Sequence, residues 1–141
     1  MKRSASAVWR GGIKDGKGSI STQSGVLEQV RYGFSSRFAE GPGTNPEELI
    51  AAAHAGCFTM AVSAQLEEAG MVADCLETTA TVTLDKVEND FRISAVHLVL
   101  FAQVPGAERQ AFETLVNQAK DTCPVSRVLD ARITLECSLE A

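Results

Sequence analysis

The chain has 141 residues, 45% of them hydrophobic, and a formal net charge of −5 at pH 7. This length and composition predict one globular domain over residues 1–141. The acidic balance argues against a nucleic-acid partner, and the basic residues near the start are scattered as on a solvated edge. We expect no apolar run of membrane-spanning length and no signal peptide, hence a cytoplasmic protein without a membrane partner.

The pattern of apolar residues and turn signals predicts a mixture of strands and helices, taken here in chain order. The expected elements are strands over 4–10, 18–23 and 26–34, a loop over 35–44, a helix over 46–69, strands over 78–87 and 91–104, a helix over 107–121, a helical turn over 123–129 and a strand over 132–139. The strand over 91–104 is apolar on both faces, which predicts a central strand covered on two sides. His97 within it is expected to be a hydrogen-bonded core residue.

The long helix has a clear start. Asn45 is a suitable N-cap, Pro46 fits the first helical position, and Glu48 stands where a capping box requires it. The body of the helix is rich in alanine and glycine between residues 51 and 56, which permits close approach of another helix. Its apolar stripe is predicted to be Leu49, Ala53, Cys57, Met60 and Ala64, with Leu66 a little off the line.

Four cysteines need an explanation in a cytoplasmic chain, where structural disulfides are uncommon. No pair has CxxC spacing, and with two histidines no zinc pattern forms, so no metal site is expected. Cys137 lies on the apolar face of the last strand and is interpreted as a small core residue. Cys75 lies in a polar connection and is given no chemical role.

Cys57 and Cys123 carry the chemistry. Cys123 precedes a proline at the start of a helical turn, where free N–H groups favour a thiolate. Cys57 lies inside its helix, so a cation must reach it from elsewhere if it is to react. Arg37, in the loop before the helix, is the nearest candidate, although a surface charge is the alternative interpretation.

Glu47 has no local role once Glu48 is assigned to the cap. It lies about 15 Å from Cys57 along one helix, so the two cannot share a site within it. If two copies cross antiparallel near Ala52, Glu47 of one copy lies level with Cys57 of the other. We therefore hypothesise a site assembled across a homodimer.

Five segments of the chain carry a recognisable combination of motifs: Gly18 to Leu27, Tyr32 to Phe38, Gly43 to Leu49, Ala53 to Phe58, and Cys123 to Arg127. Together they resemble the OsmC/Ohr family of osmotically inducible and organic hydroperoxide resistance proteins, and the resemblance extends over essentially the whole chain. Tyr-Gly-Phe-Ser-Ser-Arg-Phe and Ala-His-Ala make the chain look closer to the OsmC branch.

The resemblance implies an α+β fold: an intertwined homodimer with two central helices packed between antiparallel sheets shared by both chains. It implies a cysteine-based peroxidase for organic hydroperoxides, and less well hydrogen peroxide, acting in oxidative and osmotic stress. Cys57 would be peroxidatic, Cys123 resolving, Arg37 would stabilise the Cys57 thiolate and Glu47 would orient Arg37. Arg10 is the reserve candidate for the site arginine.

The implied chemistry needs no metal, flavin or haem, and its electrons come from an external dithiol, for which a lipoyl-type group is one candidate. The resemblance reverses the local ranking of the two thiols, since an arginine beside a partly buried thiolate outweighs a helix end. An apolar pocket near Phe38, Phe58 and Met60 is expected to favour alkyl peroxides.

Two alternatives stay open at this point. The first is a thiol–disulfide redox sensor whose cysteine pair responds to oxidants without significant turnover. The second is a binding module for small apolar ligands, in which the cysteines are incidental.

Overall fold

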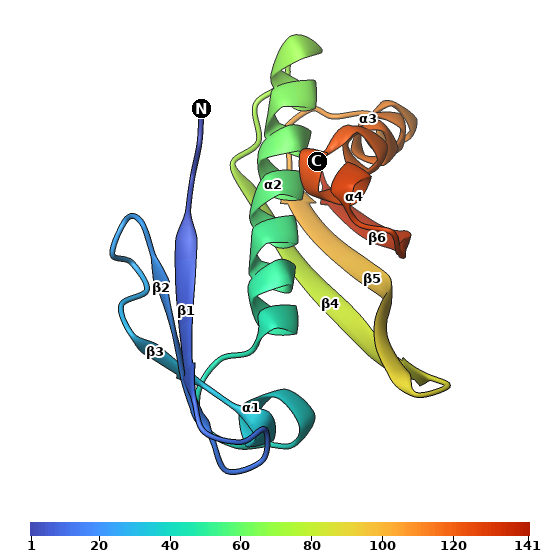
Figure 1. Ribbon diagram of the computed structural model, residues 1–141. Coiled ribbons are helices and arrows are strands. Elements are labelled where there is room, and N and C mark those ends of the chain that lie inside the picture. Colours follow the sequence, from blue (N-terminus) through green and yellow to red (C-terminus); the bar gives the residue numbers. More distant parts are fainter. The chain divides into compact units, whose positions relative to one another are not determined.

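The computed structural model describes residues 1–141, which form two compact units, residues 1–49 and residues 50–141. Figure 1 labels the elements. They are β1 (Ala5–Arg10), β2 (Lys17–Thr22), β3 (Val30–Tyr32), α1 (Phe34–Phe38), α2 (Pro46–Glu68), β4 (Cys75–Val87), β5 (Asp90–Gln103), α3 (Arg109–Thr122), α4 (Pro124–Val128) and β6 (Arg132–Glu140). Most predicted elements are confirmed to within a few residues. The single domain expected over the whole chain stays a prediction.

The first unit is built on an antiparallel sheet in the order β1-β2-β3. Gly18 of β2 pairs with Trp9 on one side and Tyr32 on the other. The Trp9 and Tyr32 rings meet edge-on, with centroids 5.6 Å apart. A Cβ at Gly18 would lie 2.5 Å from the Tyr32 ring and 2.7 Å from Trp9, so only glycine leaves room for this aromatic contact.

Two predictions in this unit are wrong in detail. The expected loop over 35–44 begins with the helix α1, whose start is closed by Ser36: its hydroxyl accepts the N–H of Gly33 at 2.9 Å. The third strand is shorter than predicted, because Gln29 adopts a left-handed φ of 51° and interrupts the extended backbone before Val30.

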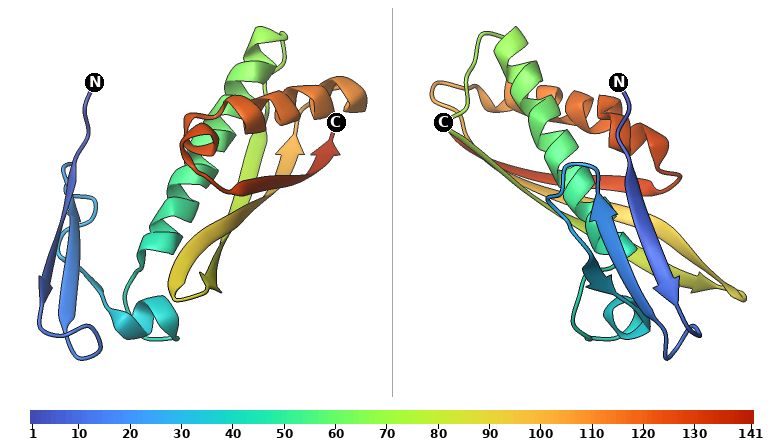
Figure 2. Two further views of the ribbon diagram at one scale, coloured as in Figure 1. Left: turned by 45° about the vertical axis from the view of Figure 1, so that its right-hand side comes forward. Right: turned by 60° about the vertical axis from the view of Figure 1, so that its left-hand side comes forward.

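The second unit contains the sheet β4-β5-β6. β4 pairs antiparallel with β5, whereas β6 pairs parallel to β5, so the expectation of purely antiparallel sheets is wrong for this sheet. The reason is the connection: α3 and α4 carry the chain back across the sheet, as a parallel pair requires. Both views of Figure 2 show α2 and α3 on the same side of the sheet.

The core of the second unit lies between these helices and β5. Its fully buried residues come from α2, from alternate positions of β5 and the residue after it, from α3, and from the residue before α4. They are Phe58, Val62, Leu66, Val96, Leu98, Leu100, Ala102, Val104, Phe112, Val116, Ala119 and Cys123. The face of α2 that they define is His54, Phe58, Val62 and Leu66. Leu66 is buried as predicted, but Ala53 and Cys57 of the predicted stripe lie one residue before the buried His54 and Phe58, and Met60 is 76% exposed.

The expectation that no apolar run reaches the length of a membrane span is wrong for α2. Its 23 residues are long and apolar enough to cross a membrane by length and composition, although a core helix passes the same test.

β5 is the central strand, but the chain covers it on one face. Val99 and Phe101 on the other face are 43% and 37% exposed. His97 shares that face, so it is hydrogen-bonded as expected but is not a core residue. Its two ring nitrogens contact Thr134 Oγ1 and Glu136 Oε2, both at 2.6 Å.

Candidate functional site

Cys57 and Cys123 lie in contact although 66 residues separate them in the sequence. Their sulfur atoms are 3.0 Å apart, and both cysteines are unbridged. Cys57 is presented by the middle of α2 and is half-buried, and Cys123 is fully buried at the junction of α3 and α4. A disulfide needs about 2.05 Å between sulfurs, so closing this bond requires a movement of only about 1 Å.

The free N–H groups at the start of α4 act on the Cys57 thiol, and the Cys123 side chain does not cap them. Cys123 is the N-cap of α4, as predicted, but its side chain makes no capping hydrogen bond. Instead the backbone N–H of Val125, in the first turn of α4, acts on the Cys57 sulfur. The dipole argument thus applies, but to the opposite thiol.

Burial raises the pKa of the Cys57 thiol above its ordinary value. The neighbouring Cys123 acts in the same direction, mainly through the hydrogen bond between the two thiols, which favours the neutral form, and less through charge repulsion. The Val125 N–H lowers the pKa of Cys57 in part. A Cys57 thiolate at neutral pH therefore needs a positive charge in addition to this N–H.

Arg37 and Glu47 form a second cluster, within the first unit. Arg37, near the end of α1, donates from Nε and Nη2 to Glu47 Oε1, at 3.1 and 2.9 Å. Glu47 lies in the first turn of α2 and is 9% exposed, and its Oε2 is buried without a partner. The guanidinium also lies 5.2 Å from the centre of the Phe38 ring. Two sides of the arginine are therefore fixed by its neighbours.

The start of α2 explains how Glu47 is held. Asn45 accepts the N–H of Glu48 at 2.7 Å, which confirms it as the N-cap, and its amide donates to the carbonyl of Ser36 at 2.9 Å. The Glu48 carboxylate accepts the hydroxyl of Thr44 at 2.8 Å. These contacts tie α1 to the first turn of α2, the two segments that carry Arg37 and Glu47.

Arg37 lines a small cavity of about 230 Å³. The other lining residues, mostly aromatic, are Trp9, Ile13, Tyr32, Gly33, Phe34 and Phe38. Of the apolar residues expected near the site, Phe38 belongs to this cavity, whereas Phe58 is fully buried in the core of the second unit. A guanidinium facing aromatic walls suits a ligand with one polar and one apolar end.

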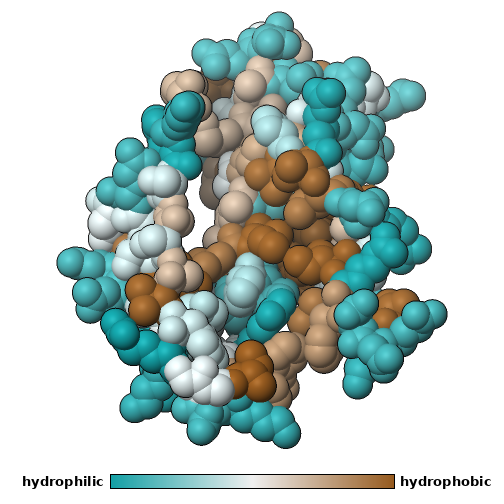
Figure 3. Space-filling view, viewed as in Figure 1, coloured by the Kyte–Doolittle hydropathy of each residue, from teal (hydrophilic) through white to brown (hydrophobic).

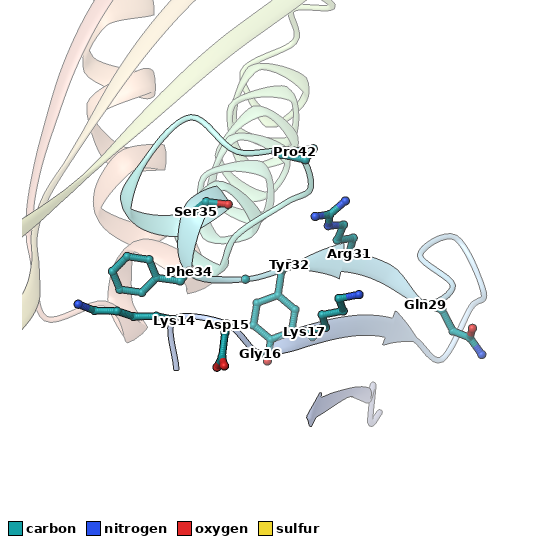
Figure 4. Close-up of a pocket in the computed structure, with 12 residues that line it drawn as sticks. Lys14, Asp15, Gly16, Lys17, Gln29, Arg31, Tyr32, Phe34, Ser35 and Pro42 are labelled. Carbon is teal, nitrogen blue, oxygen red and sulfur yellow. The ribbon is translucent and has the colours of Figure 1, made fainter. Parts of the chain in front are cut away.

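A larger and more polar cavity of about 470 Å³ adjoins it at Tyr32, Gly33 and Phe34. Figure 4 shows Lys14, Lys17 and Arg31 around this cavity, with Asp15 beside them. Of the basic residues near the N-terminus, Lys14 and Lys17 thus line a hollow and not a flat edge.

The remaining candidates lie apart from both clusters. Arg10 is exposed at the end of β1 and lines a separate polar cavity with serines of β1 and β2. Cys75 begins β4, three residues earlier than that strand was predicted to start, and is exposed. Cys137 packs against the core as expected, where burial raises the pKa of its thiol. No group of His, Cys, Asp or Glu side chains is arranged to hold a metal ion.

One buried polar pair was missed by the sequence analysis. His54 is fully buried on α2, and its Nε2 lies 2.7 Å from the hydroxyl of Ser126 on α4. A signal existed in the spacing, because His54 stands three residues before Cys57 and Ser126 three residues after Cys123. Three-residue spacing places side chains on one helix face.

Comparison with known proteins gives a consistent result. The family described as OsmC-like protein matches residues 39–138. The chain is 50% identical over 141 residues to peroxiredoxin OsmC of Escherichia coli K12, covering all of this chain and 99% of that protein. It is 30% identical over 125 residues to the organic hydroperoxide resistance protein OhrB of Bacillus subtilis, covering 87% of this chain and 89% of that one. The crystal structure of that OhrB superimposes with a TM-score of 0.70 at 29% identity, over 96% of this chain and 98% of the other.

Proposed function

The chain belongs to the OsmC-like protein family, and from this premise we propose that Cys57 is the peroxidatic and Cys123 the resolving cysteine of a thiol-dependent peroxidase. The substrates are organic hydroperoxides, and the protein belongs to a stress response. The observation that carries the assignment is the 3.0 Å contact between the two sulfurs, one half-buried and one fully buried. An incidental pair of cysteines has no reason to meet at this distance from opposite halves of the chain.

The reaction proceeds in three steps. The Cys57 thiolate attacks the outer oxygen of ROOH: an S–O bond forms, the O–O bond breaks, and the alkoxide takes up a proton and leaves as ROH. The Cys123 sulfur then attacks the sulfenic sulfur, and the hydroxyl leaves as water with the proton of Cys123. An external dithiol reduces the resulting disulfide by exchange and is itself oxidised. The identity of that dithiol, for which a lipoyl-type group is a candidate, belongs to this proposal.

The positive charge that Cys57 requires comes from Arg37, which Glu47 orients. A guanidinium stays charged and offers donors both to a thiolate and to a peroxide oxygen. The Glu47 contact takes Nε and Nη2, which fixes the plane of the guanidinium. The aromatic cavity around Arg37 supports an alkyl or lipid hydroperoxide, with the peroxide group at the arginine and the alkyl group against the rings.

The complete site is assembled across a homodimer, in which Arg37 and Glu47 of one chain meet the thiols of the other. α2 supports this because it is apolar beyond the face it buries in its own unit: Ala52, Ala53 and Gly56 are exposed, as is Met60. Figure 3 shows apolar residues along and beside α2 at the surface. A helix that is apolar all round needs a second partner, and small residues allow another α2 to cross closely. A cytoplasmic location completes the proposal.

The test is reduction of cumene hydroperoxide with dithiothreitol as electron donor. Cys57→Ser should abolish peroxide consumption, because the attacking sulfur is lost. Cys123→Ser should consume about one equivalent per Cys57 and then stall, because the sulfenic acid has no resolving partner. Cys75→Ser is the matched control, since that thiol is exposed and lies outside both clusters; it should turn over like the wild type.

Other outcomes would contradict the assignment. If Cys123→Ser never reacts while Cys57→Ser still consumes peroxide, the two roles are reversed. If the wild type forms the Cys57–Cys123 disulfide with peroxide but does not turn over with any dithiol, the chain is a redox sensor.

A further inference from the structure

His54 is an unusual residue for its position. It is fully buried in α2, about one turn before Cys57 and the core residue Phe58. Its Nδ1 is buried without a hydrogen-bond partner, and its one side-chain hydrogen bond joins Nε2 to the hydroxyl of Ser126. Burying an incompletely satisfied imidazole costs free energy that an aliphatic side chain would not cost. Packing alone therefore does not explain a histidine at this position, and its hydrogen bond to Ser126 is the feature that distinguishes it from an aliphatic residue.

Ser126 lies on α4, the element that carries the groups acting on Cys57. α4 has five residues and follows directly on Cys123, whose sulfur contacts that of Cys57. A helix of this length has no stability of its own, so its position depends on the contacts it makes. The His54–Ser126 hydrogen bond joins α4 to α2 one turn away from the sulfur–sulfur contact.

The sulfur contact changes during the reaction, whereas the His54–Ser126 bond does not take part in it. Once Cys57 is a sulfenic acid, the thiol–thiol hydrogen bond is gone, and a second contact is needed to keep Cys123 within reach. The competing reaction is a second attack on ROOH, which converts the sulfenic acid into a sulfinic acid and releases ROH. Which reaction wins depends on how closely Cys123 is held.

We propose that His54 and Ser126 are a positioning pair that holds Cys123 and the start of α4 against Cys57, so that the sulfenic acid is captured as a disulfide before it is oxidised further. The competition with over-oxidation rests on the proposed peroxidase function. The effect on the proximity of the two sulfurs does not depend on it. Neither residue touches the reacting atoms.

The test uses full-length Ser126→Ala, which removes the hydroxyl, beside Ser126→Thr, which keeps it. Ser138→Ala is the control, an exposed serine of β6. The first measurement is the equilibrium of the Cys57–Cys123 disulfide with dithiothreitol, in which no peroxide is present. Ser126→Ala should favour the reduced dithiol by about tenfold, whereas Ser126→Thr and Ser138→Ala should stay within about twofold of the wild type.

The second measurement is the fraction of Cys57 converted to sulfinic acid per turnover with cumene hydroperoxide, followed by mass spectrometry. Ser126→Ala should raise it about tenfold, and Ser126→Thr should not. Because Ser126→Ala leaves a buried imidazole unpaired, the double variant His54→Leu with Ser126→Ala is made as well. It removes both polar groups together, which is far less damaging to folding, and should show the same two changes.

The outcomes separate this inference from the function. If the disulfide equilibrium of Ser126→Ala and of the double variant equals that of the wild type, the positioning role is wrong, and the pair only contributes to stability. If the equilibrium shifts but the wild type consumes no peroxide, the positioning role holds and the proposed function fails.

Discussion

At the scale of single residues, the two sulfurs show how a tertiary contact redirects a local effect. The free N–H groups at the start of α4 are a local property of Cys123 and Pro124. In the folded chain the N–H of Val125 acts on the Cys57 thiol, because Cys57 contacts Cys123 at that end of α4. The thiol that the local dipole favours is therefore set by packing and not by position in the sequence.

His54 gives a prediction about pH. Burial lowers the pKa of His54 from its ordinary value of 6.5, so the folded chain holds the imidazole neutral where the unfolded chain protonates it. Above about pH 6.5 His54 is neutral in both states and has no effect. As the pH falls below 6.5, the unfolded chain binds a proton that the folded chain does not, and the free energy of unfolding decreases by up to about 1.4 kcal/mol per pH unit until the lowered pKa is reached.

The measurement is urea unfolding between pH 7.5 and 5, comparing the wild type with His54→Gln. Both proteins contain His97, so any effect of that residue on the pH dependence of the free energy of unfolding is the same in each. The wild type should lose stability more steeply on acidification than His54→Gln. Parallel curves would show that His54 titrates alike in the folded and unfolded chains.

At the scale of elements, the face of α2 that packs on the sheet is tested by Phe58, which is fully buried in the core. Phe91, at the start of β5, offers a comparison because the same type of side chain is 51% exposed there. Phe58→Ala should lower the free energy of unfolding by about 3–5 kcal/mol, because it leaves a cavity between α2, β5 and α3. Phe91→Ala is the matched control and should cost less than half as much, measured by urea unfolding at one protein concentration. Equal losses would mean that α2 does not form the core contact described here.

At the scale of the whole molecule, the homodimer predicts complementation between two inactive variants. Arg37→Ala lacks the site cation, and Cys57→Ser lacks the attacking sulfur. If the site takes Arg37 from one chain and Cys57 from the other, a mixed dimer has one complete site. Half of the dimers in an equimolar mixture are mixed, so the activity should recover to about a quarter of the wild-type value.

The measurement is peroxide consumption after the two variants are co-refolded, with each variant refolded alone as the control. Both controls should stay near background. A mixture as inactive as the controls would place Arg37 and Cys57 of the site in the same chain.

The local sequence determined much of the fold and of the candidate site. Several signals lie within a few residues of one another: the N-cap at Asn45, the apolar run of β5 and the Cys-Pro start of α4. The elements follow these signals closely. The family segments, which include Arg37, Cys57 and Cys123, are likewise contiguous stretches. This is why the α+β class and the family could be predicted, and why Cys57 and Cys123 could be selected as candidates.

Tertiary structure decided the rest. The buried face of α2 differs from the predicted stripe because both its faces are apolar, and only the packing against β5 and α3 selects one. The parallel pairing of β6 depends on where the α3–α4 connection crosses the sheet. The Cys57–Cys123 and His54–Ser126 contacts join residues 66 and 72 positions apart. Their geometry exists only when α4 is docked on α2, because the position of a five-residue helix is set by what it packs against and not by its own sequence.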